Sequence, residues 1–285
     1  MGMSLARICG IALDILFGAK ESCPACGRLG SASSLCNECM ALIPMVHPPM
    51  CSVCGTPLRG GVRLNDAGRD VCAGCREIRH YFESARAPAI YEGAAREHVH
   101  DLKYRARVEI VPALSKMMAL LAIRTGMADK CDSAVPVPLH PDKLVRRGFN
   151  QAELLARSVA MLLGIPMIAG GLSRRASTGT QTFLDRRHRR DNVLRAFVCD
   201  EPARVAGRTV LLIDDVITSG ATADGCARAL LRSGASRVHV LAFAVSVADA
   251  RDWALSRNPG SAVHTGQRSE AWQQEEHGPG SQRLW

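Results

Sequence analysis

Asp214 and Asp215 form a pair of adjacent carboxylates at the end of an apolar run, Val210 to Ile213. Four consecutive β-favouring residues are typical of a parallel strand that is covered on both faces. In open α/β sheets, ligands bind beyond the carboxyl ends of such strands. Two adjacent carboxylates repel a phosphate, so we expect them to face ribose hydroxyls or a Mg²⁺ ion.

A run of small and hydroxylated residues follows and is suited to bind an anion. It consists of Thr218, Ser219, Gly220, Ala221 and Thr222, and it leads into a helix predicted from Thr222 to Leu231. Free backbone N–H groups and the positive end of the helix dipole both favour a phosphate there. The acids and the loop together predict a sugar-phosphate site. In the alternative interpretation, the acid pair and the glycine turn only cap a strand and a helix.

Eight of the twelve cysteines stand in four pairs with CxxC spacing: Cys23/Cys26, Cys36/Cys39, Cys51/Cys54 and Cys72/Cys75. This spacing lets two thiolates bind one metal ion from a tight turn. Gly27 and Gly55 follow two of the pairs, as zinc-knuckle turns prefer. Eight thiolates would complete two closed tetrahedral sites, so we predict two structural zinc ions, whose binding contributes folding energy.

The cysteine pattern leaves alternatives. Sequential pairing gives two ribbons, 23–39 and 51–75, and an interleaved arrangement, in which the first pair shares a metal with the third, is the alternative. A disulfide frame is disfavoured in a cytoplasmic chain, and an iron–sulfur cluster less often uses this paired spacing.

The remaining pattern predicts the elements that must position these groups. Strands are expected at 87–91, 133–137, 165–168, 209–213 and 237–245, and helical patterning runs through 102–104, 110–123 and 149–163. Strands that alternate with helices indicate a parallel sheet. We predict an amphipathic helix at 1–19, which is too short to span a bilayer and is interrupted by Asp14, so we expect a cytoplasmic protein without a membrane span.

Three segments resemble known families. VLLIDDVITSGAT, at 210–222, is similar to the 5-phosphoribosyl-1-pyrophosphate (PRPP) motif of type I phosphoribosyltransferases. VPVPLHPDKLVRRGFNQAELLA at 135–156, QTFLDRRHRRDNVLRAF at 181–197 and the four cysteine pairs resemble the ComF/GntX family. The resemblance implies an α/β fold: a parallel-sheet, type I phosphoribosyltransferase-like domain at 84–248, preceded by a double zinc ribbon at 20–80. A disordered tail is expected at 250–285.

The resemblance also implies ligands and site residues. PRPP or a nucleotide would bind at 214–222, with Mg²⁺ accompanying PRPP. The cations expected on the pyrophosphate side are Lys103, His140, Arg146 and Arg147, together with Arg107. Lys103 and Arg107 would otherwise be ordinary surface charges. Thr180 stands where the family usually has a proline before the glutamine, Gln181, which is expected to loosen that loop.

Net charge of +9 favours polyanionic partners. Seven arginines lie between 174 and 195, including Arg186, Arg187, Arg189 and Arg190. They could form a solvated helix face, a lid over pyrophosphate or a wall that follows a nucleic-acid backbone. The low aromatic content, 4%, argues against a large base-stacking platform.

These features are consistent with two functions, one in DNA binding and one in enzymatic catalysis. The family resemblance implies a role in DNA uptake and natural transformation, or in the use of DNA as a nutrient. Single-stranded DNA and DNA-uptake or recombination proteins would then be partners. The alternative is an active phosphoribosyltransferase of nucleotide or nucleoside metabolism. Its acceptor is not indicated, because the sequence carries no evident base-recognition element.

Overall fold

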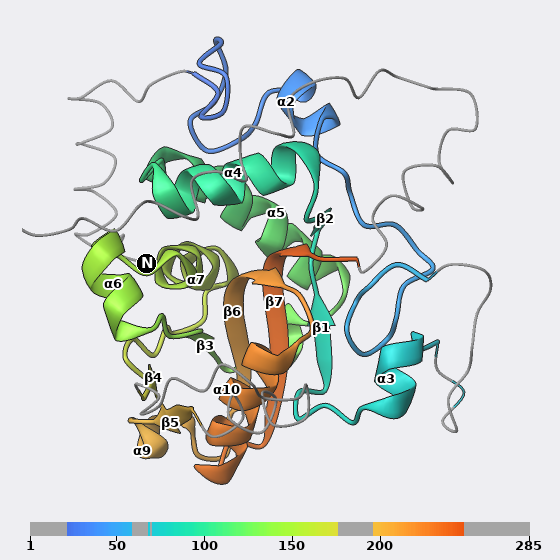
Figure 1. Cartoon of the computed structure of the whole chain (residues 1–285), viewed down its shortest axis with the longest axis vertical. Coiled ribbons are helices and arrows are strands. Elements are labelled where there is room, and N and C mark those ends of the chain that lie inside the picture. The colour runs from blue at the N-terminus through green and yellow to red at the C-terminus, as the bar shows by residue number, and fades with distance from the viewer. Residues whose placement is uncertain (1–21, 59–67, 69, 176–195, 248–285) are drawn as a thin grey trace, which may run out of the picture. The chain divides into compact units, whose positions relative to one another are not determined.

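The computed structural model describes residues 22–58, 68, 70–175 and 196–247 (Figure 1). The predicted N-terminal helix, the predicted tail and the arginines at 186–190 lie outside the described residues. The strands are β1 (Ser84–Arg86), β2 (Ala89–Ile90), β3 (Ser133–Pro136), β4 (Leu172–Arg174), β5 (Phe197–Cys199), β6 (Thr209–Ile217) and β7 (Arg237–Val245). The helices are α2 (Asn37–Ala41), α3 (Ala73–Glu77), α4 (Gly93–Tyr104), α5 (Val111–Arg124), α6 (Pro141–Arg147), α7 (Gln151–Leu163), α9 (Pro202–Val205) and α10 (Ala221–Arg232), with 3-10 turns at Val108–Ile110 and Ala128–Lys130.

A parallel sheet forms the centre of the protein, with β6 and β7 in its interior. Its order is β1-β7-β6-β3, and β2 also pairs with β7. Val210 to Ile213 of β6 lie opposite Ser133 to Pro136 of β3 on one side and Val238 to Leu241 of β7 on the other. The predicted parallel-sheet fold is therefore confirmed.

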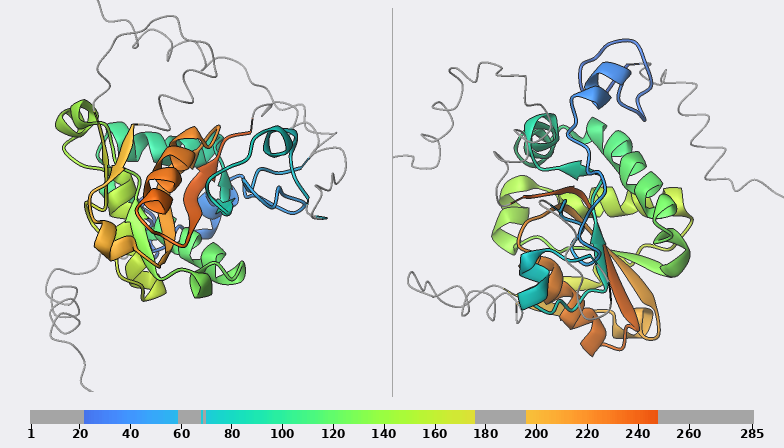
Figure 2. Two further views of the ribbon diagram at one scale, coloured as in Figure 1. Left: turned by 90° about the horizontal axis from the view of Figure 1, so that it is seen from below. Right: turned by 90° about the vertical axis from the view of Figure 1, so that its right-hand side faces the viewer.

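Helices cover both faces of this sheet (Figures 1 and 2). Leu211 and Ile213 of β6 pack into one hydrophobic cluster with residues of α4, α5 and α7. Val210 and Leu212 face the opposite cluster, which includes Cys226 of α10. Burial on both faces explains the continuous apolar run that precedes the two acids.

Strand β6 is longer than the apolar run predicts. The strand continues through Asp214 and Asp215 to Ile217, because Val216 and Ile217 still pair with Ala244 and Val245 of β7. The acids therefore lie within the carboxyl-terminal half of a strand, where the backbone is held by its neighbours, and not in the loop that follows.

The prediction of a strand at 165–168 is wrong, because Met167 forms only an isolated β-bridge, with Ala134 of β3. Pro166 has no N–H to donate to a ladder, which limits pairing at this edge. Two short strands not anticipated from the sequence, β4 and β5, form an antiparallel pair. None of the helices among the described residues has the length and apolar composition required to cross a membrane.

Candidate phosphate site and metal centres

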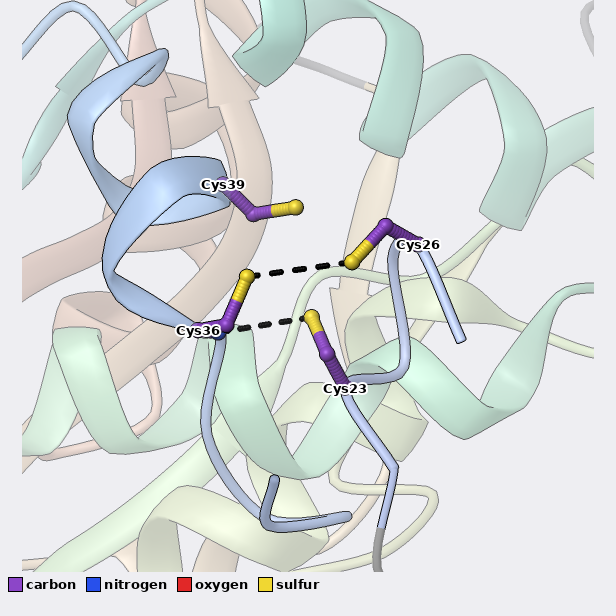
Figure 3. A group of neighbouring side chains, drawn as sticks. All are labelled: Cys23, Cys26, Cys36 and Cys39. Atoms are coloured by element: carbon purple, nitrogen blue, oxygen red, sulfur yellow. Dashed lines mark hydrogen bonds between the residues drawn. The ribbon is translucent and has the colours of Figure 1, made fainter. Parts of the chain in front are cut away.

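The eight paired cysteines gather into two groups of four. Cys23, Cys26, Cys36 and Cys39 form one group, and Cys51, Cys54, Cys72 and Cys75 form the other. Within each group the sulfur atoms all lie within 4.8 Å of one another. The pairing is therefore sequential, and the interleaved alternative does not occur. Figure 3 shows the first group, in which the four side chains converge from a loop and from the start of α2.

The local backbone explains how each group is positioned. Gly27 and Gly55 adopt φ of 74° and 73°, and their amides donate to the carbonyls of Cys23 and Cys51. Only glycine adopts this left-handed conformation at little cost, so each first pair is held in a tight turn. The second pair of each group begins a short helix, because Cys36 and Cys72 are the N-cap residues of α2 and α3.

The sulfur geometry fits tetrahedral zinc. Four Zn–S bonds of about 2.3 Å in a tetrahedron place the sulfur atoms about 3.8 Å apart. The Cys26–Cys36 and Cys54–Cys72 sulfur pairs are each separated by 3.7 Å. All the described cysteines are free thiols, so no disulfide frame forms within this part of the chain. Both groups fit structural zinc sites of the closed Cys₄ type.

Crowded thiols titrate unequally without a metal. Burial acts to raise the pKa of Cys23, but backbone amides, foremost that of Cys36, outweigh it and lower this pKa to about 6. Burial and the neighbouring sulfurs raise the pKa of Cys39 to about 12. A divalent cation would remove this conflict by neutralising all four thiolates together.

The predicted phosphate loop lies between β6 and α10. Gly220 is the N-cap residue of α10, with φ of 75°, and Thr218 and Ser219 are exposed. The Ser219 hydroxyl lies 3.5 Å from the amide nitrogen of Ala221. The left-handed glycine begins α10, whose first amides have no carbonyl partner within the helix and lie at the positive end of its dipole, as an anion site requires.

The two acids before this loop have different environments. Asp215 is buried and its Oδ2 lies 2.9 Å from Nζ of Lys103, in the last turn of α4. Asp214 is partly exposed, and its Oδ1 accepts a hydrogen bond from the amide of Asp215. Burial and the adjacent Asp215 carboxylate raise the pKa of Asp214 well above its usual range. Of these two acids, only Asp215 belongs to an ion pair among the described residues.

The Lys103 ammonium is held charged by this arrangement. Burial acts to lower the pKa of Lys103, but the Asp215 carboxylate outweighs it, and the pKa is raised overall. A positive charge is therefore fixed beside the acids at neutral pH.

Known proteins match both parts of this architecture. A family model for the double zinc ribbon domain matches residues 12–76, and one for the phosphoribosyl transferase domain matches residues 146–280. The DNA utilization protein YhgH of Escherichia coli K12 is 32% identical over 216 residues, which cover 72% of the present chain and 94% of YhgH. The chain belongs to the ComF/GntX family.

More distant relatives agree with this membership. Competence protein F of Haemophilus influenzae is 27% identical, with coverage of 74% of the present chain and 90% of that protein. Competence protein ComFC of Bacillus subtilis is 25% identical, with coverage of 82% and 92%. The predicted combination of a double zinc ribbon with a phosphoribosyltransferase-type fold is therefore confirmed.

The RRGFNQ segment of this ComF/GntX chain, 146–151, joins α6 to α7. Gly148 ends α6 in the left-handed conformation, and Asn150 caps α7 by accepting from the amide of Ala152. The Asn150 side-chain amide also donates to the carbonyl of Val137, 3.0 Å away. The motif thereby fastens two helices to the carboxyl end of β3.

Each of the four predicted pyrophosphate-side cations has a different environment. Lys103 pairs with Asp215, as described. The Arg147 guanidinium lies 5.4 Å from the ring centroid of Tyr104 and donates to Gln151. Arg146 is exposed at the end of α6. His140 is the N-cap residue of α6, and its Nδ1 accepts from the amide of Asp142.

Arg107 is engaged away from this group. Its guanidinium pairs with Asp101 and Glu109 and donates to the carbonyl of Pro24, 2.8 Å away, in the first cysteine turn. These contacts assign it a structural role between α4 and the first ribbon in this structure.

A basic cavity of about 620 Å³ lies between β5 and α10. Arginines from two segments line it: Arg175, the second arginine of the run at 174–195, and Arg228 and Arg232 of α10. The walls also include Phe197 and Cys199 of β5, and its described lining residues include no acid. The Arg174 guanidinium packs over the Phe197 ring, 5.5 Å from the centroid.

Two residues near the phosphate loop were not found from the sequence, His80 and Asp224. Asp224 lies in the first turn of α10 and is 1% exposed, and its Oδ2 lies 2.8 Å from Nδ1 of His80. The available signal was an acid among small residues, between Ala223 and Gly225 on a buried helix face. A buried acid requires a partner, although the sequence does not identify it.

Proposed function

We propose that this ComF/GntX protein binds the 5′-phosphate of PRPP, or of a nucleotide, in the loop at 218–222. The observation that carries the proposal is the succession of a buried parallel strand, two acids and a left-handed glycine at the start of α10. Backbone amides of the loop would hold the phosphate. Asp214 would accept from ribose hydroxyls or bind the Mg²⁺ ion that accompanies PRPP.

The cations beside the acids suit the leaving-group end of the same ligand. Lys103 holds Asp215 in place and keeps a fixed positive charge beside the acids, while Arg147 and Arg146 lie on α6 beyond the end of β3. Such charges would balance the pyrophosphate of bound PRPP. Mg²⁺, when bound with PRPP, would neutralise further negative charge on that group.

The biological setting that we propose is DNA uptake for natural transformation, or the use of DNA, in the cytoplasm. It is supported by the names of the relatives, DNA utilization protein for YhgH and competence protein for the two others. Single-stranded DNA would bind chiefly through its backbone phosphates. The arginine-lined cavity and the net charge of +9 support such electrostatic binding.

An active phosphoribosyltransferase is the second candidate. Transfer would displace pyrophosphate from C1′ of PRPP through an oxocarbenium-like transition state, which needs a fixed 5′-phosphate and a neutralised leaving group. The loop and the Lys103 charge would supply these two requirements. The acceptor is not identified by any group described above.

Calorimetry on the zinc-loaded protein tests the proposal. PRPP with Mg²⁺ should bind at one site per chain, and the double substitution Asp214→Ala, Asp215→Ala should weaken it at least about tenfold. Glu153, whose half-buried side chain pairs with Arg157 on α7, provides a control, because Glu153→Gln should leave the affinity unchanged. Unchanged PRPP affinity in the double variant would show that the two acids do not form the site.

A further inference from the structure

We propose that His80 is a positioning residue that connects the second cysteine group to the phosphate loop, so that its contacts set how well the loop holds a phosphate. The effect on phosphate binding rests on the function proposed above. The connection itself rests on contacts between residues that are far apart in the sequence.

The first contact is a buried two-point attachment. The Asp224 carboxylate accepts from Nδ1 of His80 through Oδ2 and from the backbone amide of Tyr81 through Oδ1, each at 2.8 Å. The His80 side chain is 7% exposed. Because a carboxylate only accepts, the Nδ1 atom of His80 must carry the proton. The first turn of α10 is thus fastened to residues 80–81 by both oxygens of one acid.

The second contact is between aromatic rings and the loop glycine. A Cβ atom on Gly220 would lie 3.4 Å from Cε1 of His80 and 3.6 Å from the Phe82 ring. The two rings stack with centroids 4.6 Å apart and an interplanar angle of 21°, and Phe82 is buried. His80 and Phe82 therefore form a wall against Gly220, the residue at which the loop turns into α10.

The cysteine group fixes where this wall begins. Cys72 is the N-cap residue of α3 and Cys75 lies within this helix, which ends at Glu77, three residues before His80. The other two sulfurs, of Cys51 and Cys54, belong to a turn held on β1, since Ala85 donates to the Val53 carbonyl and Arg86 to that of Ser52. A metal ion would join these two turns and so anchor residues 76–82 to the sheet.

This arrangement predicts a specific consequence of losing the His80 ring. Without its bond, Asp224 keeps a buried negative charge near the start of α10, close to where an anion is to bind, and Gly220 loses part of its wall. Both effects act on the loop. They do not act on Lys103, which lies on α4 across the sheet from α10.

Three variants and two measurements test the inference. In His80→Ala, hydrogen exchange of the amides at 218–222 should accelerate at least about tenfold, and the affinity for ribose 5-phosphate should fall by a similar factor. Affinity for magnesium pyrophosphate should stay the same. His80→Asn, whose amide can replace the Nδ1 donor, should recover most of both losses. His47→Ala, at an exposed histidine, is the matched control.

The outcomes separate this inference from the proposed function. Unchanged exchange at 218–222 in His80→Ala overturns the inference whatever the ligand is. So does an equal loss of both ligands together with a lower melting temperature, because it indicates only a structural role. If exchange accelerates but the wild-type protein binds neither PRPP nor ribose 5-phosphate, the connection holds and the proposed function is wrong.

Discussion

Lys103 and Asp215 form an ion pair that joins the last turn of α4 to the carboxyl-terminal half of β6, with 2.9 Å between Nζ and Oδ2. Both side chains are largely removed from water, with 20% and 5% exposed. The neighbouring acid, Asp214, has a raised pKa in place of such a pair. We therefore expect the two adjacent acids of this motif to have opposite effects on stability.

Removing the paired acid should destabilise the protein. Asp215→Asn leaves the Lys103 ammonium buried beside a neutral amide, so we expect a loss of about 2 kcal/mol in the free energy of unfolding. Urea unfolding measures this loss. Adding Lys103→Met to the variant should recover part of it. Equal stabilities for Asp215→Asn and the wild type would contradict an energetically important pair.

Removing the unpaired acid should have the reverse effect. A carboxyl group whose pKa is raised on folding binds its proton more tightly in the folded state, so stability falls as the pH rises through its folded pKa. Asp214→Asn removes this cost and should stabilise the ligand-free protein by roughly 1 kcal/mol at neutral pH. The same variant should bind PRPP with Mg²⁺ less tightly. A melting temperature below that of the wild type at neutral pH would refute the assignment.

Metal content should follow the two cysteine groups. We expect two zinc ions per chain by elemental analysis, and one in the double variant Cys51→Ser, Cys54→Ser, because two thiolates cannot complete a tetrahedral site. The variant should also lose solubility. Cys199→Ser, outside both groups, should retain two ions. A fully folded preparation without metal would defeat the structural role of zinc.

Buried histidines should make the protein acid-sensitive. His239 is 4% exposed on β7, and burial lowers its pKa; burial lowers the pKa of His98 as well. The unfolded state then binds more protons below the ordinary histidine pKa of about 6.5, so stability should decrease as the pH falls through that value. Thermal unfolding between pH 7.5 and 5.5 measures the slope, which His239→Gln should reduce. An identical slope in the variant would exclude His239 as its source.

Binding of single-stranded DNA should depend strongly on salt. If Arg186, Arg187, Arg189 and Arg190 contact the backbone, changing all four to glutamine should flatten the dependence of affinity on ionic strength, because fewer counterions are released. Arg175→Gln with Arg232→Gln tests the cavity in the same way. If the dependence of DNA affinity on ionic strength is unchanged by both sets of substitutions, the DNA binds elsewhere.

If the four arginines instead form a catalytic lid, pyrophosphate affinity should fall while DNA binding persists.

Local patterns were sufficient to predict much of the fold. The bounds of β7 agree with the expected strand at 237–245, because every residue after Arg237 is buried and the apolar run is continuous. The cysteine turns could be predicted equally well, because CxxC spacing and the glycine that follows are local requirements of a single turn. The strand expected at 165–168 failed for the same local reason, the missing donor of Pro166.

The contacts that complete the site could not be predicted, because they join distant segments. His80 and Asp224 are 144 residues apart in the sequence, and neither belongs to a motif. Arg147 meets Tyr104 only because the end of α6 reaches the end of α4. The pairing of Lys103 with the second acid likewise depends on how α4 crosses the sheet.

The first ribbon is built into the main hydrophobic core, where Cys23, Leu35 and Ile43 pack in one cluster with Val99 and Leu102 of α4. A newly made chain that fails to acquire zinc would therefore expose the core itself, and not merely a detached appendage. Such chains are targets for cellular proteases. We expect the abundance of this protein to follow the zinc supply of the cell, so that a zinc-starved cell would hold less of it at an unchanged rate of synthesis.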